Sequence, residues 1–284
     1  MAEYFINADS GDDVGGDGSS GTPWETLAHA FDNTIADDTI TCQDSTATYA
    51  FVADTFDHNI TIQGEQDDAS GAVFDGAGAS VWWITTADII IQGLTFQNID
   101  FGSNETAVLV ANGTALEVTI SNCIYINISA NNTYSGIVMC MNANSIGGIG
   151  TIVNVRVSKI TLDGSVLCAG IVYVRDSTAD VTLTNCSSYT EDLGALSSAF
   201  SVADRTSTVT FKNVIAQITG SAEFAQYVGN GPKTVTATYC CFHGYTSPAT
   251  GTGVITSDPL FVDAPNDDLR LRPTSPCIDV GTLV

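Results

Sequence analysis

Apolar and polar residues alternate in short segments of this chain, and the alternation returns at a nearly constant interval. Seven segments carry aliphatic or aromatic side chains at their first and third positions, apart from Ala237 at one third position, and in five of the seven the residue between them is Thr. They begin, about 29 residues apart on average, at Ile60, Ile89, Val118, Val155, Val181, Val209 and Val235. Alternation with a period of two predicts a β-strand that has one buried and one solvated face.

Each of these segments ends in a turn signal and is followed by further strands. Residues Gly64, Gly93, Asn122, Asn185 and Asn213 hold the fifth position, where Gly and Asn enter the left-handed region at little cost. A second strand follows each bend, and a third set of apolar segments recurs in register with the first. Three strands per repeat predict one coil of a parallel solenoid, in which each strand pairs with its equivalent one coil away.

The two ends of the chain depart from the repeat. Thr22-Pro-Trp-Glu25 has the form of a capping box, and Trp24, Leu27, Ala28 and Phe31 follow at helical spacing. A short amphipathic helix is therefore expected to cap the first coil. The tail is punctuated by proline and is expected to cap the last one. The predicted organisation is a strand, a Gly/Asp-rich loop and a capping helix over 1–40, coils over 41–250, and a cap over 251–284.

The chain resembles the right-handed parallel β-helix proteins of the pectate-lyase-like superfamily, including viral β-helices. The opening Tyr4-Phe-Ile-Asn with Gly21-Thr-Pro-Trp-Glu, the strand-Asn/Gly-strand coils and the closing Asp258-Pro-Leu-Phe-Val with Ser275-Pro-Cys-Ile-Asp carry this resemblance. It implies an all-β, single-stranded right-handed parallel β-helix. Such helices serve as polysaccharide lyases, glycoside hydrolases, virus tailspikes and structural spacers, so the fold alone does not select a function.

Charge narrows the range of partners. The 284 residues include 32 acidic and 8 basic side chains, a net charge of −24, which would repel a nucleic acid backbone.

No apolar run approaches the roughly 20 residues of a membrane helix, so no membrane partner is expected. The first residues carry neither a basic segment nor an apolar secretion signal. The expectation is a virion protein made in the host cytoplasm, with secretion after trimming of a signal as the alternative.

The third strand set offers a candidate contact surface. If Val108, Val110, Val172 and Val174 are buried, a row of apolar side chains points outward. An outward apolar row on such a chain indicates docking of a protein partner. Two alternatives stay open: loops near residues 129–150 cover the row, or aromatic rings in it stack on sugars. The row consists of Trp83, Leu109, Met139, Met141, Ile171 and Tyr173.

Two further groups of residues are weak candidates for chemistry. Arg175-Asp176 and Asp204-Arg205 end neighbouring strands, where they would supply an acid and a charge stabiliser, or only an ion pair on the surface. Asp9, Asp12, Asp13 and Asp17 lie on a Gly-rich loop with oxygen ligands that Ca²⁺ prefers, although the spacing is not that of a defined calcium loop. A plain acidic turn is the alternative, and no other cofactor is expected.

The cysteines indicate packing rather than cross-linking. Cys123, Cys186 and Cys240 share one position of the repeat, with Ile160 and Val214 in the coils between them. Two coils separate such residues by roughly 9.6 Å, which exceeds disulfide reach. Buried thiols and a reducing place of synthesis are therefore expected.

These patterns together favour a non-enzymatic structural β-helix, such as a capsid-decoration or tail-associated protein that docks through its apolar face. The resemblance to viral β-helices implies a trimer, and a capsid or tail protein is the other expected partner. The alternatives are a polysaccharide lyase or glycoside hydrolase acting on an extracellular glycan, and a carbohydrate-binding module without turnover.

Overall fold

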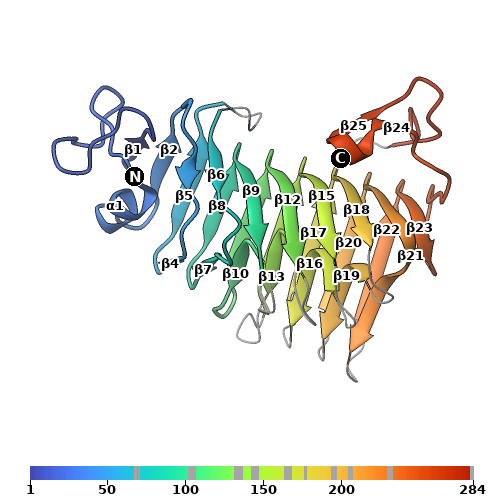
Figure 1. Cartoon of the computed structure of the whole chain (residues 1–284). Helices are drawn as coiled ribbons and strands as arrows, with labels where there is room; N and C mark the ends of the chain where they lie inside the picture. Colours follow the sequence, from blue (N-terminus) through green and yellow to red (C-terminus); the bar gives the residue numbers. More distant parts are fainter. Residues whose placement is uncertain are drawn as a thin grey trace.

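Parallel β-strands stacked along one axis make up nearly all of the computed structural model (Figure 1). The structure describes residues 1–66, 69, 71–101, 107–130, 137–141, 147–162, 168–175, 178–192, 197–203, 207–228 and 233–281, with side chains left out in parts of the later strands. Each strand pairs in parallel with its equivalent in the next coil. The predicted fold class, a parallel β-helix with a short N-terminal helix, is confirmed.

One face of the stack is a nine-stranded sheet that contains the alternating segments. In β5, Ile60 and Ile62 are buried while Thr61 between them is partly exposed, and β11 repeats this with Val118 and Ile120. The alternation therefore reports the inner and outer sides of this sheet correctly. In spatial order, its strands are β1 (Glu3–Ile6), β2 (Asp38–Cys42), β5 (Ile60–Gly64), β8 (Ile89–Gln92), β11 (Glu117–Ser121), β14 (Ile149–Val153), β17 (Asp180–Thr184), β20 (Ser207–Lys212) and β22 (Lys233–Thr238).

The residue after each of β8, β11, β14, β17, β20 and β22 turns the chain through the left-handed region. Gly93 has φ of 66°, and Asn122, Asn154 and Asn185 have φ of 53°. The asparagine side chains also join neighbouring coils, because the Asn154 amide donates to Asn122 Oδ1 at 3.0 Å. The predicted bend is confirmed at Gly93, Asn122, Asn185 and Asn213, whereas Gly64 does not adopt a positive φ.

The fourth coil differs from the prediction. Val118 pairs with Gly150, which pairs in turn with Val181, so the equivalent segment is β14. The segment that begins at Val155 lies after the bend, in β15 (Arg156–Leu162). Val155 therefore occupies the position that had been assigned to Ile160, between Cys123 and Cys186.

The other two faces of the stack are joined into one sheet, because the long strand β21 (Ile215–Val228) pairs with β18, β19 and β23. The face after the bend comprises β3 (Tyr49–Ala50), β6 (Val73–Asp75), β9 (Thr95–Asp100), β12 (Ile124–Ala130), β15, β18 (Ser187–Asp192), the start of β21 and β23 (Cys241–Thr246). The third face comprises β4 (Asp54–Phe56), β7 (Trp83–Thr85), β10 (Leu109–Ala111), β13 (Met139–Met141), β16 (Cys168–Arg175), β19 (Ser197–Ala203) and the end of β21.

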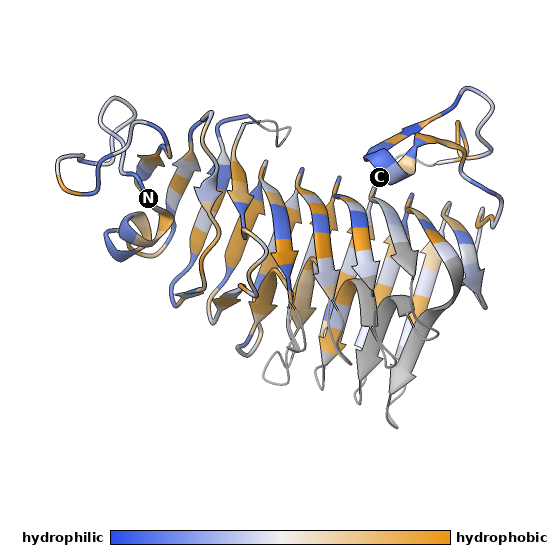
Figure 2. Ribbon diagram, in the orientation of Figure 1, coloured by the Kyte–Doolittle hydropathy of each residue, from blue (hydrophilic) through white to orange (hydrophobic). Residues whose placement is uncertain are grey.

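The hydrophobic core fills the space between the three faces, and hydrophobic and hydrophilic bands alternate along many strands (Figure 2). Cys123, Cys186 and Cys240 are buried in it, and none of the cysteines whose side chains are described forms a disulfide. Burial raises the pKa of Cys123 to about 12. Within the described ranges, no helix has the length and apolar character needed to cross a membrane.

The helix α1 (Leu27–Asp32) covers the first coil, but it begins later than the capping box predicts. Its N-cap is Thr26, whose hydroxyl accepts from the His29 backbone N–H at 3.2 Å. Asp13 holds this cap in place, since its carboxylate accepts from the Thr26 hydroxyl at 2.7 Å and from the Glu25 backbone N–H at 2.8 Å. The loop before the helix therefore determines where the helix starts.

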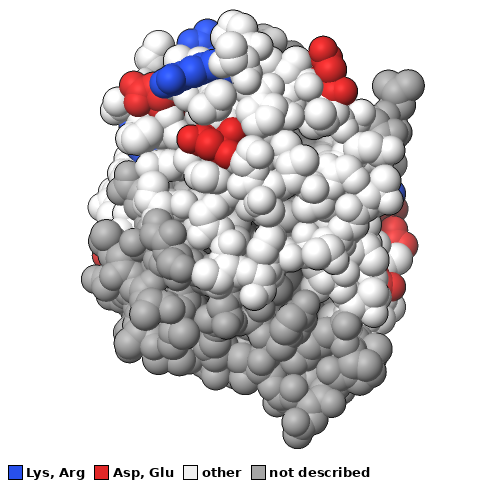
Figure 3. Space-filling view, turned by 90° about the vertical axis from the view of Figure 1, so that its right-hand side faces the viewer, with Lys and Arg blue, Asp and Glu red and all other residues white. Residues whose placement is uncertain are grey.

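The C-terminal tail caps the last coil only in part. Ile255 forms a β-bridge with Cys241 and extends the stack, and the end seen in Figure 3 carries few charged residues among those described. The chain then folds back as a hairpin of β24 (Phe261–Asp263), the 3₁₀ turn η1 (Ala264–Asn266) and β25 (Asp268–Leu271), which we call the arm. In Figure 1 the arm lies along the outer side of the stack, not at its end.

The arm is attached by one polar and one apolar group of contacts. Asp267 binds Arg156 Nη2 at 3.2 Å and also accepts a short hydrogen bond from Ser158. Phe261 and Leu269 pack with Tyr189 of β18 in a separate apolar cluster. Attachment of the arm therefore uses the outward-facing side chains of β15 and β18.

Candidate ligand pocket

The predicted outward apolar row is wrong in its orientation. Trp83, Leu109, Met139 and Met141 are at most 1% exposed and belong to the main core. Ile171, at 3% exposed, belongs to the same core. These five side chains are not available for docking.

A register shift of one residue explains the error. Met139, rather than Val138, pairs with Val172. Because side chains alternate between the faces of a strand, one residue of slip moves a whole set to the other face. Val172 and Val174 lie in the core as predicted, whereas Val110, which the same pattern places inside, belongs to a separate outer cluster.

That outer cluster is also covered. It consists of Ala107, Val110, Cys140 and Tyr173, all at most 8% exposed, with Trp82 and Ile84 packed against it. Tyr173 thus points to the outer side of the sheet, as predicted, but it is 1% exposed. Its ring is therefore not accessible for stacking on a sugar or for contact with a protein partner. Residues 131–136 and 142–146 of the predicted covering loops lie outside the described residues.

The side chains of the candidate catalytic residues also lie outside what the structure describes. Arg175 ends β16 without a described side chain, and Asp176, Asp204 and Arg205 lie outside the described residues. Their role stays a prediction.

The four aspartates of the Gly-rich loop each bind protein donors instead of converging on one point. Asp9 accepts from the Thr46 backbone N–H at 2.6 Å, and Asp12 from that of Val14 at 2.8 Å. Asp13 holds the helix cap, and Asp17 accepts from the Thr22 hydroxyl at 2.5 Å. Among the described residues, no three potential metal ligands gather. These carboxylates order the loop.

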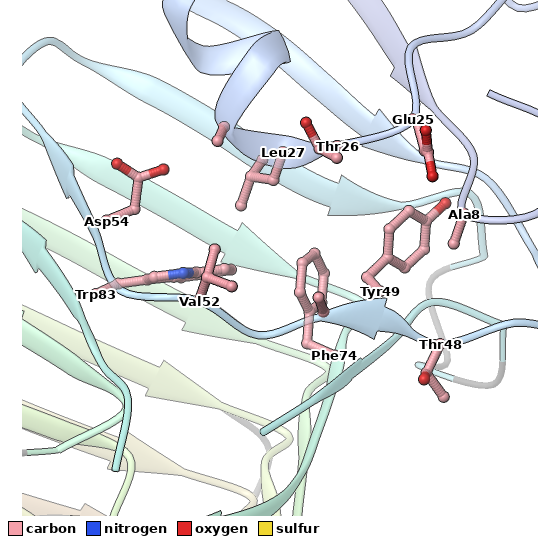
Figure 4. Close-up of a pocket in the computed structure, with 12 residues that line it drawn as sticks. Ala8, Glu25, Thr26, Leu27, Thr48, Tyr49, Val52, Asp54, Phe74 and Trp83 are labelled. Atoms are coloured by element: carbon pink, nitrogen blue, oxygen red, sulfur yellow. The ribbon is translucent and has the colours of Figure 1, made fainter. Parts of the chain in front are cut away.

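A cavity of about 290 Å³ lies between this loop, the start of α1 and the first coils. Its lining residues come from three parts of the chain, which the fold brings together at the N-terminal end of the stack. They are Ala8, Glu25, Thr26, Leu27 and Ala28 from the loop and helix, Thr48, Tyr49, Ala50, Val52 and Asp54 from the first coil, and Phe74 and Trp83 from the second (Figure 4).

Aromatic rings form one wall of this pocket. Tyr49 and Phe74 are stacked with centroids 5.1 Å apart, and Phe74 meets Trp83 edge to face at 5.3 Å. The Tyr49 hydroxyl lies 2.9 Å from the Ile6 carbonyl and 2.8 Å from that of Gln43, so the ring is held in place. These rings are at most 3% exposed, so they form the buried side of the pocket and not an open stacking surface.

Carboxylates flank that wall. Figure 4 shows Asp54 beside Trp83 at one end of the pocket and Glu25 near Tyr49 at the other. Burial raises the pKa of Asp54, although the Thr55 backbone N–H, 2.7 Å from its carboxylate, acts in the opposite direction. Glu25 is exposed at the rim, as is Val52. The pocket therefore combines an apolar lining with carboxylate acceptors at both ends.

A second hollow, of about 380 Å³, lies on the outer side of β9, β12 and β15 and is a poorer site. Its polar side chains bind one another: Asn127 donates to Asn98 at 2.6 Å, and Ser129 donates to Asp100 at 2.9 Å. No aromatic ring lines it. The hollow therefore offers a ligand neither an aromatic ring nor free polar groups on these four side chains.

Searches with the sequence and the structure differ in outcome. No protein-family model matches the chain, and neither does any curated protein sequence. Among solved structures, the chain is similar to pectate lyase Pel9A, with 12% identity, a TM-score of 0.46, and coverage of 99% of this chain and 92% of that one. It is also similar to a pectin methylesterase from Aspergillus niger, with 13% identity, a TM-score of 0.42, and coverage of 90% and 84%. A viral origin stays a prediction.

Proposed function

We propose that the chain is a carbohydrate-binding β-helix whose ligand pocket takes a sugar unit of a glycan. The observation that carries this proposal is a cavity lined by the exposed apolar side chains of Ala28, Ala50 and Val52, with the carboxylates of Asp54 and Glu25 at its ends. A sugar ring has an apolar face that suits this lining and hydroxyls at its edge that suit carboxylate acceptors. A cavity of about 290 Å³ is near the lower end for ligand pockets, which favours a small ligand.

Charge limits the kind of sugar. Both charged residues that line the pocket are acids, and the chain as a whole carries a net charge of −24. A uronate would meet repulsion from both sources. The proposed ligand is therefore a neutral saccharide and not a polyuronate.

Calorimetric titration of the full chain tests this proposal with neutral β-1,4-linked oligomers of glucose, xylose or mannose and with oligogalacturonate. Binding of a neutral oligomer and none of oligogalacturonate is expected. Ala28→Phe places a ring in the pocket mouth from an exposed helix position and is expected to abolish binding. Asp54→Asn removes a charged acceptor, which is expected to weaken binding about tenfold.

The matched control is Asp180→Asn, which removes an exposed carboxylate at the start of β17, far from the pocket. It is expected to bind as the parent does. Tight binding of oligogalacturonate, or unchanged binding by Ala28→Phe, would overturn the proposal.

Hydrolysis of the bound glycan is the second candidate function, and the raised pKa of Asp54 favours it. A general acid for glycoside hydrolysis must hold its proton near the working pH, and a second carboxylate then serves as base or nucleophile. Asp54 is proposed as the acid and Glu25 as its partner. New reducing ends from a neutral glycan, lost in both Asp54→Asn and Glu25→Gln, would support turnover. If no new reducing ends form, the chain is a carbohydrate-binding module without turnover.

A structural role in a virion, as a trimer or bound to a capsid or tail protein, stays a proposal. Such a role would need a contact surface other than the predicted apolar row. The apolar residues that were to form that row are buried. Light scattering of the purified chain tests the trimer directly: a monomer at micromolar concentration contradicts it.

A further inference from the structure

The last coil and the C-terminal tail bring two cysteine thiols into contact. Cys241 lies in β23, beside the core-facing Cys240 but on the other side of the strand. Its Sγ lies 3.1 Å from the Ser257 carbonyl oxygen and also within hydrogen-bonding reach of the Cys277 thiol, so the one S–H hydrogen can point to either acceptor. The two thiols therefore lie close enough to hydrogen-bond, although many residues separate them in sequence.

The segment around Cys277 is fixed against the same part of the chain. The Ser275 hydroxyl donates to the Pro259 carbonyl at 2.5 Å, and the Cys277 backbone N–H donates to Ser275 Oγ at 3.1 Å. Ser275 is buried, whereas Cys277 is partly exposed. These contacts hold the partly exposed Cys277 against the segment that follows the last coil, whereas Cys241 is buried.

We propose that Cys241 and Cys277 are a redox-sensitive pair that forms a disulfide when the protein meets a low-molecular-weight disulfide such as oxidised glutathione. The bond would close a loop that contains the whole arm, from β24 to β25. In the reduced protein the arm is attached by non-covalent contacts alone. In the oxidised protein the disulfide would also link the segment after the arm to the last coil.

The chemistry is a pair of thiol–disulfide exchanges. The Cys277 thiolate attacks one sulfur of the small disulfide, forming a mixed disulfide and releasing one small thiolate. The Cys241 thiolate then attacks the Cys277 sulfur and releases the second. Two protein thiols are oxidised, one small disulfide is reduced to two thiols, and the two protons lost by the cysteines end on the released small thiolates.

Exposure and acidity support this order of attack. The hydrogen bond from Cys241 lowers the pKa of Cys277, while the same contact raises that of Cys241. An exposed thiol with a lowered pKa reacts first with a small disulfide. The buried Cys42, Cys123 and Cys186 have raised pKa values and no such access, so they are expected to stay reduced.

Peptide mapping of the full chain under non-reducing conditions, after incubation with oxidised glutathione, tests the proposal. The expected result is a linked peptide pair joining Cys241 to Cys277, absent from Cys241→Ser and Cys277→Ser. Cys240→Val is the matched control, because Val155 and Val214 fill the equivalent core position in other coils, and it should still form the link. A glutathione adduct on Cys277 alone, a different pairing or no reaction would each overturn the proposal.

Trypsin provides a second readout that does not depend on mapping. Arg270 in the arm is exposed, with Asp268 Oδ2 2.6 Å from its guanidinium, and cleavage after it requires the hairpin to open. The disulfide is expected to slow this cleavage at least about tenfold relative to the reduced chain. An equal rate in both forms would refute the fastening of the arm.

Discussion

Replacing Trp83 by Ala should destabilise the protein severely, because the side chain is central to the core and to the wall of the ligand pocket. Four phenylalanine rings surround it, with centroid distances of 5.2 Å to Phe51, 5.4 Å to Phe56, and 5.3 Å to Phe74 and Phe96. A buried tryptophan removes about 150–250 Å² from water, or about 4–6 kcal/mol at about 25 cal/mol per Å², as an upper bound. Truncation of such a residue to Ala typically costs about 3–5 kcal/mol.

The assay is urea unfolding followed by far-ultraviolet circular dichroism, with the free energy of unfolding taken from the fitted midpoint and slope. Trp82→Ala is a matched control, since Trp82 is the adjacent residue and lies partly exposed on the outer side of the third face. We expect a loss of about 3–5 kcal/mol for Trp83→Ala and of no more than about 1.5 kcal/mol for Trp82→Ala. Equal losses, or a larger loss for Trp82→Ala, would refute the assignment of Trp83 to the core.

Three further predictions concern other parts of the fold. Tyr125→Phe should raise the free energy of unfolding by about 1 kcal/mol, because the fully buried Tyr125 hydroxyl finds no partner among the described residues. Asn185→Ala should lower it by about 1–2 kcal/mol and Asn185→Gly by less, since φ is 53° there; both follow from chemical unfolding. Hydrogen bonds, first that from Thr22, lower the Asp17 pKa to about 2, so the carboxylate stabilises the fold above pH 3.8, and this contribution is lost as the pH falls towards 2. A carboxyl carbon titration by NMR with its midpoint at or above 3.8 would contradict the last of these.

The sheet with the alternating segments could be predicted from sequence because each of its strands obeys one local rule. Ile60 and Ile62 in β5, like Val181 and Leu183 in β17, point inward across a polar neighbour. The bend at Asn122 follows equally from local chemistry, since few other residues adopt positive φ cheaply. These features need no knowledge of distant contacts.

The third face and the pocket depend on contacts that no local rule contains. Aligning the apolar run at Ile171 with the run before it gives a plausible register, yet the structure pairs Met139 with Val172. The pocket forms only because the start of α1 packs near the first coil. Asp13, in the preceding loop, fixes where α1 begins by accepting a hydrogen bond from the N-cap Thr26. Aromatic residues at Tyr49, Phe74 and Trp83 could have suggested a shared wall, but only the assembled coils bring them together.

The sequence pattern does not identify β14, the strand of the fourth coil in the alternating sheet, and the reason lies in one glycine. Gly150 occupies the inward position that Val118 and Val181 hold in the coils on either side. A Cβ built at Gly150 would lie 2.5 Å from Cε of Met139 and 3.2 Å from a methyl carbon of Val181. Met139, from the third face, therefore fills the volume that a valine at this position would otherwise supply. An inward glycine carries no apolar signal, so the alternation rule that identifies β11 and β17 cannot find β14 between them.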